Sequence, residues 1–129
     1  MEYNHCIPEL TVYSIEETRA FYTKLGFQVE YERPEESFLF MSFEGSQFMF
    51  EELHADGWNL GTMQYPLGQG VNFSIAVKDI DSLYQRVKAH GFPLYRDLHI
   101  SNYEVGGEVR SPRQFLLQDP NGYLLRFTT

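Results

Sequence analysis

Cysteine is almost missing from this 129-residue chain, which contains only Cys6. A single thiol cannot close an internal disulfide, so the composition indicates a reducing compartment, and we expect Cys6 to be a small buried apolar residue. No apolar run reaches the 18 residues that a membrane-spanning helix needs. The first ten residues, MEYNHCIPEL, lack the basic and apolar regions of a secretory signal. We therefore predict a cytoplasmic protein that does not associate with a membrane.

Basic residues are also scarce, because 10 Lys and Arg stand against 18 Asp and Glu, a net charge of −8. We do not expect nucleic-acid binding, which needs a basic patch, and a cationic or neutral ligand suits this charge better. The sequence has no P-loop, CxxC or Ser/His/Asp grouping to support nucleotide, thiol or nucleophilic chemistry. Hydrophobic residues still make up 43% of the chain, which is enough for a folded core.

An internal repeat is the most informative feature of the sequence. Four residues recur 65 positions later: Val12, Ile15, Gly26 and Phe27 match Val77, Ile80, Gly91 and Phe92. Apolar spacing predicts a helix over 15–25, with Ser14 as its N-cap, and a second helix over 80–90, with Asp79 as its N-cap. A glycine follows each helix and can adopt the left-handed conformation that ends it.

Strand-like segments surround both helices in the same order. They are predicted over 5–12, 27–32, 37–43 and 47–53 in the first copy, and over 71–77, 93–100, 113–118 and 123–128 in the second. The sequence DPNG at 119–122 predicts the turn between the last two, and 101–112 is expected to be a loop. We predict an α+β fold of two βαβββ modules in a single domain over 1–129, with module 1 over 1–54, a linker over 55–69 and module 2 over 70–129.

Two segments then resemble a known family. ELTVYSIEETRAFYTKLGF at 9–27 and DPNGYLLRF at 119–127 closely resemble the glyoxalase/bleomycin resistance protein/extradiol dioxygenase (vicinal oxygen chelate) superfamily. The resemblance implies that the two modules form a curved, mixed half-barrel sheet with the helices on its convex side and the site on its concave face. It also implies a homodimer. It implies no single activity, because this fold is used both by metal enzymes and by metal-free binding proteins.

The positions that hold metal in the enzymes of this family are largely replaced. By resemblance they correspond to Ile7, Asn72, Arg126 and one residue within Phe50–Glu52, for which Glu52 is the best match. Isoleucine cannot bind a metal, and arginine brings a permanent positive charge to the place of the cation. We therefore predict no metal, no cofactor and no catalytic residue, which favours binding over catalysis.

Two other functions stay open. A metal-dependent lyase, isomerase or dioxygenase of the same superfamily is the first, and a substitute ligand set of His5, Glu9 and Glu52 would serve it, since His5 and Glu9 share one face of the predicted strand. A regulatory or partner-binding module without a small ligand is the second.

The resemblance favours the bleomycin-resistance branch, whose members sequester a cationic, aromatic antibiotic. We predict a metal-free small-molecule binding protein of this kind. Its ligand needs aromatic faces and polar or charged partners, and the predicted ligand-binding residues are Tyr31, Phe38, Glu52, Trp58, Asn72, Tyr103 and Arg126. Arg126 is expected to pair with Glu52 or Glu9, with Asn72 in the same network. Arg110 and Arg113 argue against bleomycin itself, because they add positive charge near the expected site.

Overall fold

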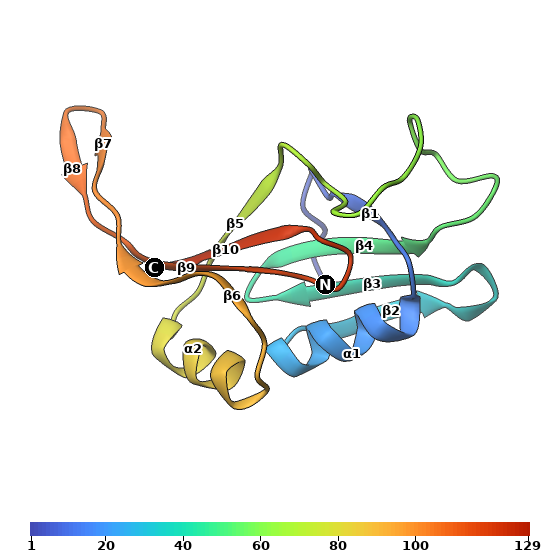
Figure 1. Ribbon diagram of the computed structural model, residues 1–129, viewed down its shortest axis with the longest axis horizontal. Coiled ribbons are helices and arrows are strands. Elements are labelled where there is room, and N and C mark those ends of the chain that lie inside the picture. The colour runs from blue at the N-terminus through green and yellow to red at the C-terminus, as the bar shows by residue number, and fades with distance from the viewer. The chain divides into compact units, whose positions relative to one another are not determined.

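The computed structural model describes residues 1–129 and divides into two compact units, Met1–Leu67 and Gly68–Thr129. Each unit has its own four-stranded mixed sheet and one α-helix (Figure 1). Neither helix is long and apolar enough to pass through a bilayer.

The first unit contains β1 (Glu9–Val12), α1 (Ile15–Leu25), β2 (Gln28–Arg33), the short 3₁₀ helix η1 (Pro34–Glu36), β3 (Phe38–Phe43) and β4 (Ser46–Glu52). Its sheet has the order β1-β4-β3-β2, in which β1 runs parallel to β4 and the other neighbours are antiparallel. The strand after the helix thus lies at one edge of the sheet and the strand before it at the other.

The second unit repeats this arrangement with β5 (Asn72–Ala76), α2 (Ile80–Ala89), β6 (Leu94–Ile100), β9 (Arg113–Gln118) and β10 (Leu124–Thr128). The sheet order is β5-β10-β9-β6, again with one parallel pair, β5 and β10. The predicted α+β class and the repeated βαβββ order are therefore confirmed.

Local signals set the ends of both helices. The Ser14 hydroxyl accepts a hydrogen bond from the Glu17 N–H at 3.2 Å, and the Asp79 carboxylate accepts one from the Ser82 N–H at 3.0 Å. These bonds satisfy N–H groups that have no partner within the helix. At the other end of α1, Gly26 has a φ of 111°, as predicted for the residue after a helix. The second helix ends at Ala89, one residue earlier than expected.

Aromatic packing holds α1 against one face of the first sheet. The ring centroids of Tyr22 on α1 and Phe50 on β4 are 4.7 Å apart, and both side chains are almost fully buried. At the edge of the same face, Arg19 of α1 donates to Glu32 of β2 at 2.7 Å. Because side chains alternate along a strand, the neighbours of these residues point to the opposite face, which no helix of this unit covers.

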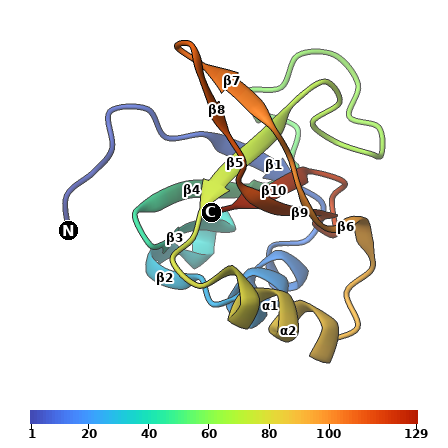
Figure 2. The same cartoon turned by 90° about the vertical axis from the view of Figure 1, so that its left-hand side faces the viewer.

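Three expectations differ from the structure. The first strand begins at Glu9 rather than at His5, so His5 lies outside it. The predicted loop over 101–112 contains a hairpin, β7 (Tyr103–Val105) and β8 (Glu108–Arg110), which extends beyond the four-stranded sheet (Figure 2). Gly106 and Gly107 both have positive φ, which is the geometry that a two-residue hairpin turn requires. Cys6 is exposed and not buried.

Candidate functional site: an acidic and aromatic hollow

The face of the first sheet opposite α1 carries a hollow of about 240 Å³. We call it the acidic–aromatic hollow, and its lining residues are Glu9, Arg33, Phe38, Glu51, Asp56, Gly57 and Trp58. Its floor is one row of side chains across the four strands, because Arg33 pairs with Phe38, Phe38 with Glu51, and Glu51 with Thr11. Residues paired in this way lie side by side on one face of a sheet. The strand register therefore brings a guanidinium, an aromatic ring and a carboxylate into contact range.

The segment that follows β4 forms the wall of the hollow. The Thr11 hydroxyl donates to Asn59 Oδ1 at 2.5 Å, which ties this segment to the end of the floor. Within the segment, Gly57 N–H donates to the His54 carbonyl at 3.2 Å and Asn59 N–H donates to the Gly57 carbonyl at 3.0 Å. These bonds place Trp58 at the rim, where its side chain is 97% exposed. An indole held in this position is available to a ligand.

Two carboxylates share the hollow. Glu9 on β1 and Glu51 on β4 both line it and lie close enough for their charges to interact, and a side-chain hydrogen bond with Glu51 is one of the influences on the Glu9 carboxyl. Burial, followed by the charge of Glu51 and this hydrogen bond, raises the pKa of Glu9, and the nearby Arg33 acts in the opposite direction. Glu9 therefore keeps its proton at a higher pH than an isolated glutamate does, and a cation bound beside the two carboxylates would favour their charged form.

His54 fixes the other side of Glu51. Its Nε2 lies 2.9 Å from Glu51 Oε1, and its Nδ1 accepts the Asp56 N–H at 3.2 Å. Since Nδ1 is an acceptor, the proton of this neutral imidazole is on Nε2 and is donated to Glu51. His54 thus orients the carboxylate, and neither ring nitrogen is left free to act as a base.

Arg33 already occupies the aromatic part of the hollow. Its guanidinium carbon lies 3.8 Å from the ring centroid of Phe38 and 5.9 Å from that of Tyr31. Its Nε donates to Glu36 Oε2 at 2.7 Å. This hydrogen bond is the main reason why the pKa of Arg33 is raised above its ordinary value. The floor of the hollow therefore accepts a planar cation.

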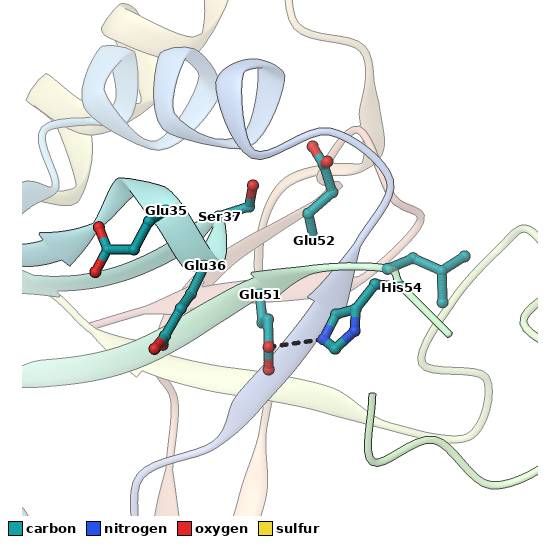
Figure 3. A pocket seen from close by; sticks show the side chains of 7 residues that line it. Glu35, Glu36, Ser37, Glu51, Glu52 and His54 are labelled. Atoms are coloured by element: carbon teal, nitrogen blue, oxygen red, sulfur yellow. Dashed lines mark hydrogen bonds and ion pairs between the residues drawn. The ribbon is translucent and has the colours of Figure 1, made fainter. Parts of the chain in front are cut away.

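A second pocket, of about 450 Å³, adjoins the hollow and shares Glu51 with it. It is lined by Glu35, Glu36, Ser37, Glu51, Glu52, Leu53 and His54. Figure 3 shows Glu51 and Glu52 pointing to opposite sides of β4, with Glu51 toward His54 and Glu52 toward α1. The Glu52 carboxylate accepts the Ile15 N–H at 3.0 Å. A carboxylate in this position stabilises the positive N-terminal end of the helix.

The second unit carries a different polar group on its sheet. Arg126 Nε donates to Asn72 Oδ1 at 3.1 Å, and the Tyr103 hydroxyl donates to Gln114 Oε1 at 2.9 Å. A hydrogen bond with Ser101 is the main reason why the pKa of Tyr103 is lowered, with burial acting against it and the nearby Arg126 guanidinium adding to it. No carboxylate of this unit forms an ion pair with Arg126.

The two arginines that argued against a cationic ligand have partners of their own. Arg113 donates two hydrogen bonds to Asp81 on α2 in a bidentate pair, at 2.5 and 3.0 Å. Arg110 lies 3.6 Å from Glu108 within the hairpin. Their charges are thus balanced locally.

The repeat shows which positions of the two units are equivalent. Thr11 and Ala76 lie 65 residues apart; Thr11 pairs with Glu51, and Ala76 pairs with Thr128. The floor of the hollow therefore corresponds in the second unit to the row His99, Gln114, Thr128 and Ala76. That row contains no carboxylate and no benzene ring. The acidic–aromatic hollow is a property of the first unit alone.

The same register changes one expectation about the metal positions. Arg126 precedes Thr128 by two residues, so its counterpart in the first unit is Met49, and not Glu52 as the sequence suggested. The four positions are then Ile7, Met49, Asn72 and Arg126. One amide oxygen among these side chains is a poor donor set for a divalent cation, which prefers several carboxylates or imidazoles. The residues present do not fit the metal of the related enzymes.

No substitute metal centre is formed by other side chains. In neither unit do three His, Cys, Asp or Glu side chains come close enough to hold a metal ion. His5, Glu9 and Glu52 do not share one face of a strand as a substitute metal site would require, because His5 precedes β1 and Glu52 points toward α1.

The structure brings some of the predicted ligand-binding residues together. Tyr31 and Phe38 stack with their ring centroids 6.0 Å apart, and Trp58 lines the same hollow as Phe38. Asn72, Tyr103 and Arg126 form the polar group of the second unit, whereas Glu52 holds the start of α1. The pairing of Arg126 with an acidic residue of the first unit stays a prediction.

Five residues that line the hollow were not among the predicted ligand-binding residues, namely Glu9, Arg33, Glu51, Asp56 and Gly57. Side chains alternate between the two faces of a strand, so the sequence QFMFEEL at 47–53 indicates that Glu51 shares a face with Met49. This pattern was a signal in the sequence for the position of Glu51.

Sequence comparison now gives the class of protein. The family model described as the Glyoxalase/Bleomycin resistance protein/Dioxygenase superfamily matches residues 2–127, and the chain belongs to this superfamily. No curated protein matches the chain.

Several solved structures are similar to this chain. A superfamily member from Vibrio splendidus 12B01 is 36% identical over 93% of each chain, with a TM-score of 0.43. A glyoxalase/bleomycin resistance protein/dioxygenase from Alicyclobacillus acidocaldarius is 27% identical over 97% of this chain and 89% of that chain, with a TM-score of 0.68. A bleomycin resistance determinant encoded on the transposon Tn5 is 21% identical over 98% of each chain, with a TM-score of 0.66, and shares the fold.

Proposed function

We propose that this chain is a metal-free protein that binds a small cationic, aromatic molecule without transforming it. The acidic–aromatic hollow carries this proposal, because it combines a carboxylate pair, an aromatic floor and an exposed indole. Carboxylates attract a cation, and aromatic faces add stacking and cation–π attraction. Sequestration of an antibiotic of the bleomycin type, and so antibiotic resistance, is the specific form of the proposal.

Binding without a metal is supported by the chemistry of the side chains. Ile7, Met49, Asn72 and Arg126 offer no set of carboxylates or imidazoles, and His54 has both ring nitrogens engaged. His54 is therefore not available as a free base.

Arg126, Asn72 and Tyr103 of the second unit are proposed to make a further ligand contact. The Asn72 oxygen accepts a hydrogen bond from Nε of Arg126, and the Tyr103 hydroxyl lies beside the same guanidinium. We propose that the guanidinium also faces an acidic group. That group belongs either to the ligand or to the first unit, where Glu52 and Glu9 are the candidates.

The expected result of ligand screening follows from this proposal. In thermal-shift measurements, metal-free bleomycin or another cationic antibiotic should stabilise the protein, by about 2.7 kcal/mol at 100 times its Kd. Treatment with a chelator should leave this stabilisation unchanged. Stabilisation by a divalent metal alone, with the metal bound stoichiometrically, would contradict the proposal and favour a metal-dependent lyase, isomerase or dioxygenase.

Removal of charge from the hollow is the matched mutational test. Glu51→Gln should weaken binding of the cationic ligand about tenfold or more, because a desolvated ion pair is lost. Glu104→Gln removes the same charge from the exposed hairpin of the second unit and should leave the affinity unchanged. Quenching of Trp58, the single tryptophan, measures both.

We further propose that the protein is cytoplasmic and forms a two-fold homodimer. Each sheet has edge strands, whose outward N–H and C=O groups can pair with a strand of another chain. Exposed apolar side chains lie on or beside the edge strands of the second sheet, for example Val71, Tyr95 and Ile100. We expect an interface of more than about 1,000 Å². Sedimentation at micromolar concentration should give twice the mass of the chain, and a monomer would contradict this assembly.

A further inference from the structure

Arg33 and Phe38 indicate what kind of cation the hollow binds. The central carbon of the Arg33 guanidinium lies 3.8 Å from the ring centroid of Phe38. A guanidinium is planar and delocalised, and it is more weakly hydrated than an ammonium, so it stacks on aromatic rings at a lower cost in hydration. Both residues line the hollow, next to carboxylates on β1 and β4. The chain thus places one of its own planar cations where the proposed ligand has to bind.

The contacts of Arg33 show that it can leave this place. Its side chain is 43% exposed, and its one ion pair is with Glu36, on the 3₁₀ helix that follows. Its remaining side-chain hydrogen bond is with Tyr31, beside Phe38. Glu36 lines the second pocket, which adjoins the hollow, and it does not line the hollow itself. Rotation toward Glu36 would therefore clear the ring of Phe38 while keeping the Arg33 charge paired.

Electrostatics makes the exchange of cations favourable. Glu9, Glu51 and Asp56 line the hollow together with Arg33 as its single cation. As long as Arg33 stays over Phe38, it repels a second cation at the same ring. A ligand cation that displaces Arg33 contacts both the Phe38 ring and the two carboxylates, Glu9 and Glu51.

We propose that the acidic–aromatic hollow selects planar, delocalised cations of the amidinium or guanidinium type, and that Arg33 is an internal competitor that such a ligand displaces from Phe38. This inference rests on the proposed function, because it concerns the same hollow. It assigns the ligand's chemical class and a residue that limits its affinity.

Three small probes test the class of ligand. Benzamidine carries a planar cation, benzylamine carries an ammonium on a similar ring, and benzamide is the neutral analogue of benzamidine. Titration followed by Trp58 fluorescence and by NMR should give the tightest binding for benzamidine and the weakest for benzamide. Phe38→Leu keeps apolar bulk but removes the ring, and it should abolish the preference for benzamidine over benzylamine.

Arg33→Gln tests the competition directly. It removes the positive charge and should strengthen benzamidine binding roughly tenfold, since like charges at close range are strongly unfavourable. Arg19→Gln is the matched control, because Arg19 pairs with Glu32, the neighbour of Arg33 on β2, but from α1 on the other face of the sheet. That variant should leave the affinity of benzamidine unchanged, and thermal melting checks that both variants are folded.

The possible outcomes separate the two proposals. If none of the probes binds to the wild type or to Arg33→Gln, the cation-binding function itself is wrong. If benzamidine binds to the wild type but Arg33→Gln binds it equally or more weakly, Arg33 is only a structural partner of Phe38 and the competition is wrong. Equal affinity for benzamidine and benzylamine would overturn the assignment of a planar cation.

Discussion

Replacing Phe50 by alanine is expected to lower the free energy of unfolding by about 3–5 kcal/mol, which is the usual cost of removing a buried phenylalanine ring. Phe50 is completely buried and lies 4.7 Å from Tyr22 and 6.2 Å from Phe48, as measured between ring centroids. The cavity would open between α1 and the sheet, where several other rings depend on the same packing. Urea denaturation followed by circular dichroism measures the change.

Trp58→Ala is the control for this prediction, since it also removes a large aromatic side chain from the first unit. Its side chain is 97% exposed, so we expect a change within about 0.5 kcal/mol. Trp58→Ala should weaken ligand binding more than Phe50→Ala does, because Trp58 lines the hollow and Phe50 does not. Comparable losses of stability in the two variants would show that Trp58 is part of the core and would remove it from the proposed site.

Gly68→Ala should destabilise the protein by about 2–5 kcal/mol. Gly68 has a φ of +74°, and an alanine there would adopt a left-handed conformation that costs about 1–2 kcal/mol. Its methyl group would also overlap the ring of Tyr123. That ring is buried and packs edge to face on Phe73, so it has little room to move, and overpacking typically adds about 1–3 kcal/mol.

Gly61 provides the matched control, because it has the same φ of +74° but nothing within 4 Å of the position where a methyl group would stand. Gly61→Ala therefore isolates the backbone term, and we expect a loss of only about 1–2 kcal/mol. Thermal and urea denaturation of both variants measure the difference. If the two substitutions have equal effects, the contact between Gly68 and Tyr123 does not limit the packing of the second unit.

Elements that depend only on residues close together in the sequence could be predicted accurately. The first helix has the predicted ends at Ile15 and Leu25, and its cap at Ser14 forms as expected. The DPNG turn also forms, with Asp119 accepting the N–H groups of Asn121 and Tyr123 at 2.8 and 2.9 Å. These structures need only hydrogen bonds within a few residues of sequence, which is why residue type and spacing were sufficient. The Gly106–Gly107 hairpin carried a similar local signal and was nevertheless missed.

The strand register of the first sheet was not determined by local sequence. The segment around β4 reads FMFEE, and a shift of one residue exchanges every side chain between the two faces of a sheet. Only the pairing of β4 with β1 and β3 decides that Glu51 faces the hollow while Glu52 holds α1. The same pairing makes Met49 the counterpart of Arg126.

The sequence by itself thus determined the repeated βαβββ order, the helix ends and the superfamily, because these follow from local spacing, caps and turn residues. The composition of the hollow was decided by tertiary structure. Arg33, Phe38, Glu51 and Glu9 come from four different strands and become neighbours only when those strands pair. Contacts between residues distant in sequence depend on the packing of the whole sheet, and no local pattern specifies which side chains will meet across it.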